Sequence, residues 1–208
     1  MKVKKILFYL LAALLGGCVP VMSLHSLYNK ENVVFEEKLL GTWVQDNNET
    51  TWEFKRIDEP KNVYKLVFSD DKSKKGSFVA HLVKLRDKLF LDVCPDELPC
   101  GQDDPNEVEW EYNSFFLIPA HTFIRIDSIE PLLKMRLTDD DKMAKLFEQD
   151  PNAVKHTSIE DGLILTASTK ELQAFVLKYA NDKRVFANEI VLARKESKDP
   201  NAPILSNQ

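Results

Sequence analysis

The residue types that most often do chemistry in proteins are sparse in this chain of 208 residues, which has three cysteines and four histidines. No His-Glu-x-x-His pair, Cys-x-x-Cys pair, nucleophile elbow or glycine-rich phosphate loop is present in the sequence. Two of the histidines, His25 and His156, have no companion at a spacing typical of metal ligands. The sequence therefore predicts neither a catalytic centre nor a metal or cofactor site.

One group of residues could bind a ligand, and it consists of His81, His121, Phe123 and Arg125. The last three alternate along one expected strand, so their side chains share a face. If this face lines a barrel, His121 and Arg125 would hold the polar end of a ligand and Phe123 would contact its apolar tail. If the face points outward, the polar residues would pair with a carboxylate such as Asp127 or be satisfied within a mixed core. The sequence leaves both arrangements open.

Cys94 and Cys100 are separated by Pro-Asp-Glu-Leu-Pro. In an oxidising compartment such a pair predicts a disulfide, which would constrain the unfolded chain by about 2–3 kcal/mol. Zinc is the alternative, but it needs four ligands and no further cysteine pair or histidine is near. The pair begins the acidic stretch 94–113, for which we expect a long solvated loop. A calcium site is the other interpretation, although the carboxylate spacing matches no known calcium loop.

The third cysteine ends an N-terminal segment of three parts: three lysines among the first five residues, an apolar run over 6–15, and then two glycines. This layout is typical of a secretory signal, and the apolar run is shorter than the about 20 residues that span a membrane. The last four residues, Leu15-Gly16-Gly17-Cys18, resemble the lipobox of bacterial lipoproteins. The resemblance implies cleavage before Cys18, a diacylglycerol on its thiol and an acylated new N-terminus. An ordinary signal with an incidental cysteine is the alternative.

The lipobox resemblance also predicts where the protein is located. Each buried CH₂ of an acyl chain contributes about 0.8 kcal/mol, so three chains would anchor the protein durably in the cell envelope. The residue after Cys18 is Val19 and not aspartate, which by resemblance to lipoprotein sorting in Gram-negative bacteria favours the outer membrane, facing the periplasm. The net charge is −5, so nucleic acid is not an expected partner and attachment to a membrane would depend on the lipid.

A second resemblance begins at residue 36, where a short helical turn is expected before Gly41-x-Trp43 at the start of a strand. This pattern resembles the N-terminal signature of lipocalin-like barrels. The resemblance implies that Trp43 plugs one end of a barrel, and that a late arginine, Arg194, stacks on its ring through a cation–π contact. Two helices are expected between the later strands, where that family usually has one.

The remaining pattern predicts an α+β fold, mainly antiparallel β, forming a lipocalin-like barrel or half-barrel with two packed helices. Strands are expected at 41–44, 50–57, 62–68, 77–85, 88–93, 114–118, 121–128, 132–137, 162–167 and 189–194. Helices are expected after Thr138 and Ser168, each opened by a capping box. Strand 77–85 is apolar on both faces, so we expect it to be covered on both sides. The expected organisation is a signal peptide (1–17), a lipidated tether (18–35), one β domain (36–195) and a flexible tail (196–208). Leu24, Leu27 and Tyr28 of the tether could dock on the domain, which would order part of it.

Three functions are compatible with these sequence features. The first is a lipid-anchored protein that binds a small hydrophobic or amphipathic ligand in its barrel, either as a closed barrel or as a half-barrel carrier. The second is a structural or assembly subunit of an envelope protein complex, with a solid barrel. The third is an enzyme, which we do not expect because no acid–base pair or nucleophile can be named.

Replacing Cys18 with serine is expected to release the protein from the membrane or mislocalise it, because serine cannot carry the diacylglycerol. Fractionation of a tagged protein measures this, and Cys94→Ser is the matched control, which should stay in the membrane fraction. Unchanged attachment of the Cys18→Ser variant would contradict the lipid anchor, and fractionation of the parent chain with inner-membrane markers would contradict the outer-membrane assignment.

Overall fold

The computed structural model describes residues 21–45, 50–70, 74–96, 118–159 and 162–195. The expected signal peptide with Cys18, the acidic stretch after Asp96 with Cys100, most of the strand expected at 114–118, and the C-terminal tail lie outside the described residues. Among the described residues, no helix is both long enough and apolar enough to cross a membrane.

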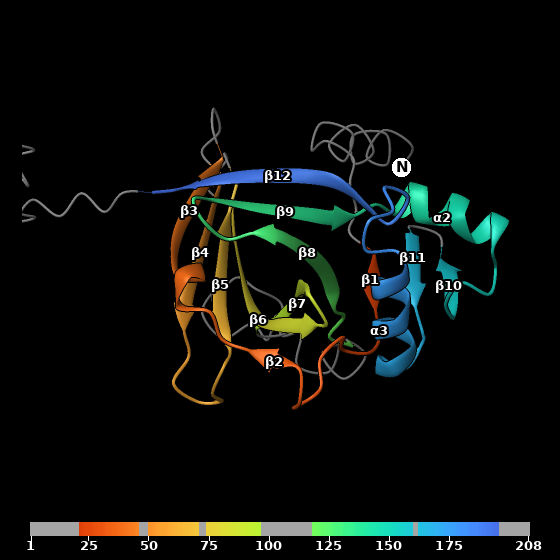
Figure 1. Cartoon of the computed structure of the whole chain (residues 1–208), viewed down its shortest axis with the longest axis horizontal. Coiled ribbons are helices and arrows are strands. Elements are labelled where there is room, and N and C mark those ends of the chain that lie inside the picture. The colour runs from red at the N-terminus through yellow and green to blue at the C-terminus, as the bar shows by residue number, and fades with distance from the viewer. Residues whose placement is uncertain (1–20, 46–49, 71–73, 97–117, 160–161, 196–208) are drawn as a thin grey trace, which may run out of the picture.

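Within the described part of the chain, eight strands form a closed antiparallel barrel (Figure 1). Each of these strands pairs with the next one along the chain, and the last pairs with the first. The sheet therefore has no open seam. This confirms the expected barrel and excludes the half-barrel. The strands are β3 (Gly41–Gln45), β4 (Thr51–Arg56), β5 (Tyr64–Ser69), β6 (Lys75–Leu85), β7 (Lys88–Pro95), β8 (Thr122–Ser128), β9 (Leu132–Thr138) and β12 (Phe186–Arg194).

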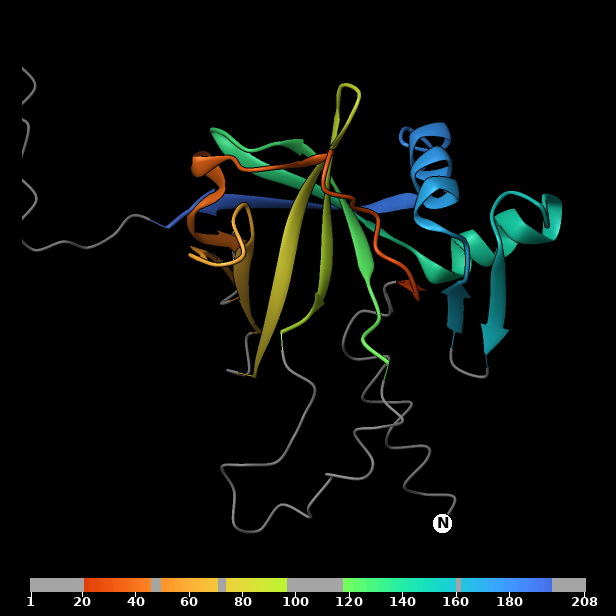
Figure 2. The ribbon, with the colours of Figure 1, turned by 90° about the horizontal axis from the view of Figure 1, so that it is seen from below.

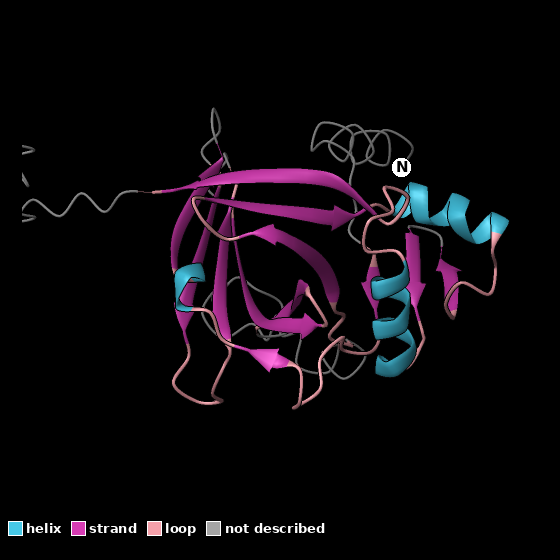
Figure 3. Cartoon of the chain, in the orientation of Figure 1, coloured by secondary structure: helices cyan, strands magenta, loops and turns pink. Residues whose placement is uncertain are grey.

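A second layer lies against one side of the barrel wall (Figure 3). It is formed by the chain between β9 and β12, together with the first described residues. Its elements are α2 (Asp140–Gln149), β10 (His156–Ile159), β11 (Gly162–Leu165), α3 (Thr169–Lys178) and β1 (Met22–Ser23). β1 pairs in parallel with β11, and the short strand β2 (Val33–Val34) pairs with β6.

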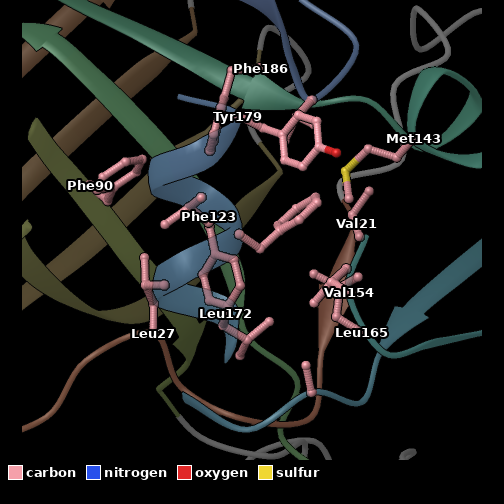
Figure 4. Packing of buried hydrophobic residues seen from close by; sticks show 14 of the residues in the cluster. Val21, Leu27, Phe90, Phe123, Met143, Val154, Leu165, Leu172, Tyr179 and Phe186 are labelled. Carbon is pink, nitrogen blue, oxygen red and sulfur yellow. The ribbon is translucent and has the colours of Figure 1, made fainter. Parts of the chain in front are cut away.

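Strand alternation divides the hydrophobic residues into two cores. On β6, Ala80 and Leu82 belong to the cluster inside the barrel, whereas Val83 and Leu85 belong to the cluster between the wall and the second layer. Figure 4 shows this outer cluster, in which Leu172 of α3 lies beside residues of the wall. The expectation that this strand is covered on both faces is therefore confirmed, as is the packing of the apolar stripe of α3 against the sheet.

One end of the barrel is closed by Trp43, which is fully buried. Its indole N–H donates a 2.9 Å hydrogen bond to the carbonyl of Leu39, in the 3₁₀ turn η1 (Glu37–Leu39). The guanidinium carbon of Arg194 lies 4.2 Å from the ring centroid, and the same group donates to the carbonyls of Leu40 (2.7 Å) and Lys38 (2.6 Å). Arg194 therefore ties the last strand to the first, and the predicted contact with Trp43 is confirmed.

The glycine of the Gly-x-Trp pattern is required at this end of the barrel. Gly41 has a φ of +114°, which side-chain-bearing residues rarely adopt. A Cβ at this position would also lie 2.8 Å from Nη1 of Arg194. A short turn, a glycine without a side chain and a late arginine are thus parts of one packed arrangement.

Two expected boundaries differ in the structure. The cap of α2 is Asp139, whose carboxylate accepts from the backbone N–H of Lys142 at 3.0 Å, and not Thr138. Thr138 still belongs to β9, where it pairs with Phe186. Docking of the expected tether is confirmed for Leu27, which is fully buried, and for Tyr28, whereas Leu24 is exposed. The described β domain therefore includes residues 21–35 and does not begin at residue 36. The capping box of α3 is confirmed by the 2.9 Å bond from the Ser168 N–H to Glu171.

The Arg194→Ala variant is expected to lose about 2–3 kcal/mol of unfolding free energy, because it removes two hydrogen bonds from a charged donor and a cation–π contact. Chemical denaturation followed by Trp fluorescence measures the loss. Arg184→Ala is the matched control, since that arginine pairs with Asp182 at the surface and should cost about 1 kcal/mol or less. Equal losses in the two variants would contradict the role of Arg194.

Candidate functional site

The predicted ligand-binding residues lie on the outer face of the barrel wall. On β8, Ile124 and Ile126 belong to the interior cluster, and Phe123, which precedes them in the alternation, belongs to the outer cluster. Arg125 follows the same alternation and forms a 2.8 Å ion pair with Asp127. The arrangement in which His121, Phe123 and Arg125 line the lumen is therefore wrong, and the outward arrangement holds. The sequence could not decide between the lumen-facing and the outward-facing arrangement, because both faces of this strand are buried.

The polar residues of this face gather around Asp92, whose side chain is fully buried on β7. One carboxylate oxygen accepts from the backbone N–H of Leu27 at 2.5 Å, and the other lies 2.6 Å from Nδ1 of His121. Because a carboxylate oxygen is an acceptor, the proton of the His121 ring is placed on Nδ1. Asp92 thus joins the N-terminal segment, β7 and the residue that precedes β8.

His81 lies opposite Asp92 on the neighbouring strand β6 and is 8% exposed. The ring of Tyr28 stacks on it, with centroids 3.8 Å apart and an interplanar angle of 16°. Its Nδ1 is buried without a hydrogen-bond partner among the described residues. Burial lowers the pKa of His81, with a smaller contribution from His121, while the Asp92 carboxylate acts in the opposite direction. The neutral ring is therefore the form that the fold favours.

Cys94 follows on the same face of β7, two residues beyond Asp92. It is a half-buried free thiol in the structure, so the expected disulfide is not found, and Cys100 lies outside the described residues. Burial, and then the carboxylates of Asp92 and Asp96, raise the pKa of this thiol to about 11. The raised pKa disfavours the thiolate, which is the nucleophilic form of cysteine.

Arg125 lines a cavity of about 200 Å³ at the edge of the outer layer, with Arg136, Asn181, Lys183 and Phe186. Its guanidinium donates to the carbonyl of Ala180, after the end of α3. Arg136 is paired as well, with Asp127 at 2.7 Å and Glu189 at 2.6 Å. Because carboxylates already neutralise both arginines, this cavity is best explained as a surface depression between ion-paired strands and the loop after α3.

The barrel interior is filled along the described residues. Its largest side chains, Trp43, Phe54 and Tyr64, have 0%, 1% and 0% of their surface exposed. A cavity that could hold a water molecule would leave accessible surface on the residues that line it. An eight-stranded barrel is just wide enough for its own side chains to fill. These residues therefore leave no room for a ligand between them.

The Tyr64 hydroxyl provides the polar contact of this interior. It accepts from the Glu36 N–H at 2.6 Å and donates to the Glu36 carbonyl at 3.1 Å. Burial raises the pKa of Tyr64 to about 12. The hydroxyl thus stays protonated and holds the segment that leads into η1.

Comparisons with known proteins add no assignment, because neither a protein family model, nor a curated protein, nor a solved structure matches the chain. Within the described residues, no group of three His, Cys, Asp or Glu side chains is arranged to hold a metal ion. The family resemblances therefore remain predictions.

Sequence reasoning missed Asp92 as a member of the polar cluster, and it named Tyr28 only as a residue that could dock on the domain. The signal for Asp92 is a single carboxylate within the apolar strand Leu89-Phe90-Leu91-Asp92-Val93. A buried carboxylate needs hydrogen-bond partners, which could have marked the position as a site of tertiary contact. Tyr28 is an aromatic residue of the expected tether, and its docking on the domain is confirmed by its stacking on His81.

Acid should destabilise the protein through His81. The folded-state pKa of this residue is lowered, so the unfolded chain binds a proton near pH 6.5 that the folded chain resists. Stability must therefore fall as the pH decreases below about 6.5, by at most about 1.4 kcal/mol per pH unit for one proton. The His81→Phe variant keeps an aromatic ring on which Tyr28 can stack. Between pH 7 and pH 5 it should lose less unfolding free energy than the parent protein, as measured by urea titrations.

The matched control is His25→Phe, which removes an exposed histidine of the N-terminal segment. This variant should keep the pH dependence of the parent protein. If His81→Phe and the parent lost the same stability between pH 7 and pH 5, His81 would not be the group responsible.

Proposed function

We propose that this protein is a lipid-anchored, non-enzymatic subunit of the bacterial cell envelope, in which the barrel is a solid scaffold and the molecular surface carries the function. The observation that supports this proposal is the packed barrel interior. Leu82, Leu91 and Leu133, which come from three different strands of the barrel, have no exposed surface. A carrier of apolar molecules would need an empty volume for its ligand in this region of the barrel.

The chemistry of the outer face supports a non-enzymatic role. The Asp92 carboxylate is occupied by a backbone N–H and by His121, and His81 is covered by Tyr28. The nearby thiol has its pKa raised to about 11, which disfavours the reactive thiolate. Asp92, His121 and His81 hold the N-terminal segment on the barrel wall, and this occupies the groups that could otherwise act on a substrate.

Location in the envelope is part of the proposal and depends on the N-terminal sequence. Acylation of Cys18 would attach the protein to the membrane, and Val19 favours the outer membrane and the periplasmic side. A protein with a filled barrel that is held at this place is suited to assemble with another envelope protein. The exposed surface of the second layer is where such a partner would bind.

A second candidate function is binding of a small apolar ligand at the edge of the barrel beside Trp52, which pairs with Trp43 of the neighbouring strand. The side chains of Trp52 and Phe68 meet edge to face with centroids 5.2 Å apart. Phe68 and Phe78 are only partly buried against the interior cluster. A flat apolar molecule could therefore stack at this edge of the barrel without entering its filled centre.

Native mass spectrometry of the protein extracted from its own envelope distinguishes the two functions. We expect the mass of the chain with its acyl groups alone, no uptake of added fatty acids or phospholipids, and co-purification of a protein partner after cross-linking in cells. A reproducible additional mass that is lost on denaturation would replace the scaffold proposal with ligand binding. Loss of that mass in Phe78→Ala, but not in the surface variant Val191→Ala, would place the ligand at this edge of the barrel.

A further inference from the structure

The second layer contains a strand with an open edge. Its three strands lie in the order β1, β11, β10, so β10 (His156–Ile159) has a neighbouring strand on one side only. The opposite edge of this sheet is covered, because Ser23 of β1 forms two backbone hydrogen bonds with His121. In Figure 2, β10 is the outermost of the three strands, and no described segment runs along its outer side. β2 also has one neighbour but is only two residues long, so β10 is the longest strand with an open edge among the described residues.

The register with β11 decides which backbone groups of β10 face outward. The N–H of Thr166 donates to the carbonyl of Lys155 at 3.0 Å, and Thr157 occupies the next hydrogen-bonded position of the same pair of strands. Bonded and non-bonded positions alternate along an antiparallel pair. The N–H and C=O groups of His156 and Ser158 therefore point away from β11, toward the open edge.

The set of outward-facing backbone groups is limited to these two residues. The carbonyl of Val154, which precedes them in the same alternation, already accepts from Nδ1 of the His156 ring at 2.9 Å. That ring is also held by stacking on Phe147, with centroids 4.0 Å apart. At the other end, the strand stops one residue after Ser158. The N–H and C=O groups that remain free for pairing thus lie symmetrically about Thr157.

The open edge lacks the features that usually prevent strand pairing. Native proteins typically protect such edges with lysine, proline or a bulge. β10 contains neither lysine nor proline, and its pairing with β11 has a regular register. Ser158 is exposed, and Ile159 is 43% exposed. A further extended strand could therefore be added here without burying a charged side chain of β10.

We infer that β10 pairs with β10 of a second copy of this chain, in antiparallel orientation about a two-fold axis at Thr157. In this arrangement His156 of each copy lies opposite Ser158 of the other, and every outward N–H and C=O group obtains a partner. Thr157 lies opposite its own counterpart at a non-bonded position, where threonine pairs are favourable. In the sequence, Lys155 precedes the strand and Glu160 follows it, so antiparallel copies meet with unlike charges at their ends. A two-fold contact requires a surface that complements itself, and the symmetric placement of the outward groups meets this requirement.

The contact is small, which determines where it forms. Two strands of four residues bury far less than the about 1,200 Å² of a stable interface. Two copies anchored in one membrane have a higher effective concentration than two copies in solution. The inference deepens the proposed function, on whose anchor it rests for this effect, because it names a second copy as the partner of the second layer.

Disulfide trapping tests the pairing in the full chain, reconstituted in phosphatidylcholine vesicles with Cys94 and Cys100 replaced by serine. Thr157→Cys sets two thiols opposite each other at the two-fold axis, within the range that a disulfide bridges. Val191→Cys on β12 is the matched control, because Val191 is also exposed, at 37%. Mild oxidation should give at least about five-fold more disulfide-linked dimer for position 157 than for position 191. Equal amounts of dimer would overturn the pairing.

A charge exchange tests the two-fold arrangement itself. Thr157→Lys or Thr157→Glu alone sets like charges directly opposite each other and should separate the copies, whereas a mixture of the two variants sets unlike charges opposite and should restore pairing. Energy transfer between donor-labelled and acceptor-labelled copies, each labelled at Val191→Cys, measures this. It should fall at least about two-fold for either variant alone and return to the parent level in the mixture. An unchanged signal, or no recovery in the mixture, would contradict a second copy as the partner.

Flotation of the same vesicles distinguishes this inference from the proposed anchor. A chain that does not float with the lipid contradicts the anchor, while the ratio of the two cross-linked variants still tests the pairing. A chain that floats but is cross-linked equally at positions 157 and 191 overturns the pairing and leaves the anchor in place.

Discussion

Closure of the barrel is the constraint on which the rest of the structure depends. The first strand has to meet the last across about 150 residues of chain, and Arg194 secures this contact by stacking on Trp43 and binding the carbonyls of Leu40 and Lys38. The plug also explains Gly41, because a side chain there would displace the guanidinium. Once the sheet is closed, no barrel strand keeps an unpaired edge along its whole length, and the interior can be packed without a cavity.

Closure has a consequence for the location of any function. The described interior side chains are buried, and the buried polar groups of the molecule gather on its outer wall. There the buried Asp92 carboxylate binds Leu27 and His121, and Tyr28 covers His81. The cost of burying these polar groups is offset by their mutual contacts and by the N-terminal segment that they hold. The result is a domain whose start is fixed on its own wall.

Many of the expectations that held depend on neighbouring residues. The two-residue turn between β6 and β7, the capping box of Ser168 and Glu171, and the apolar stripe of α3 follow from local backbone geometry and from periodicity. β1 and β2 are two residues each, and β10 has almost no buried side chain. Elements of this kind carry no periodic signal. β1 and β2 are strands because they pair with the distant β11 and β6, and β10 is a strand because it pairs with the adjacent β11.

The sequence by itself determined the alternation of each strand, the plug residues Gly41, Trp43 and Arg194, and the N-terminal pattern that predicts export and acylation. Only the tertiary structure decided that His121 and Arg125 face away from the lumen, because both faces of the wall are apolar and alternation cannot say which one lies inside. The sequence left open whether Leu27 and Tyr28 dock on the domain, and only the tertiary structure decided that residues 21–35 belong to it. Their main contact joins Leu27 to Asp92, which are 65 positions apart. The lone carboxylate in an apolar strand marks Asp92 as a site of tertiary contact, but nothing in the sequence names Leu27 as its partner, because the strength of this hydrogen bond depends on burial that exists only after the barrel has closed.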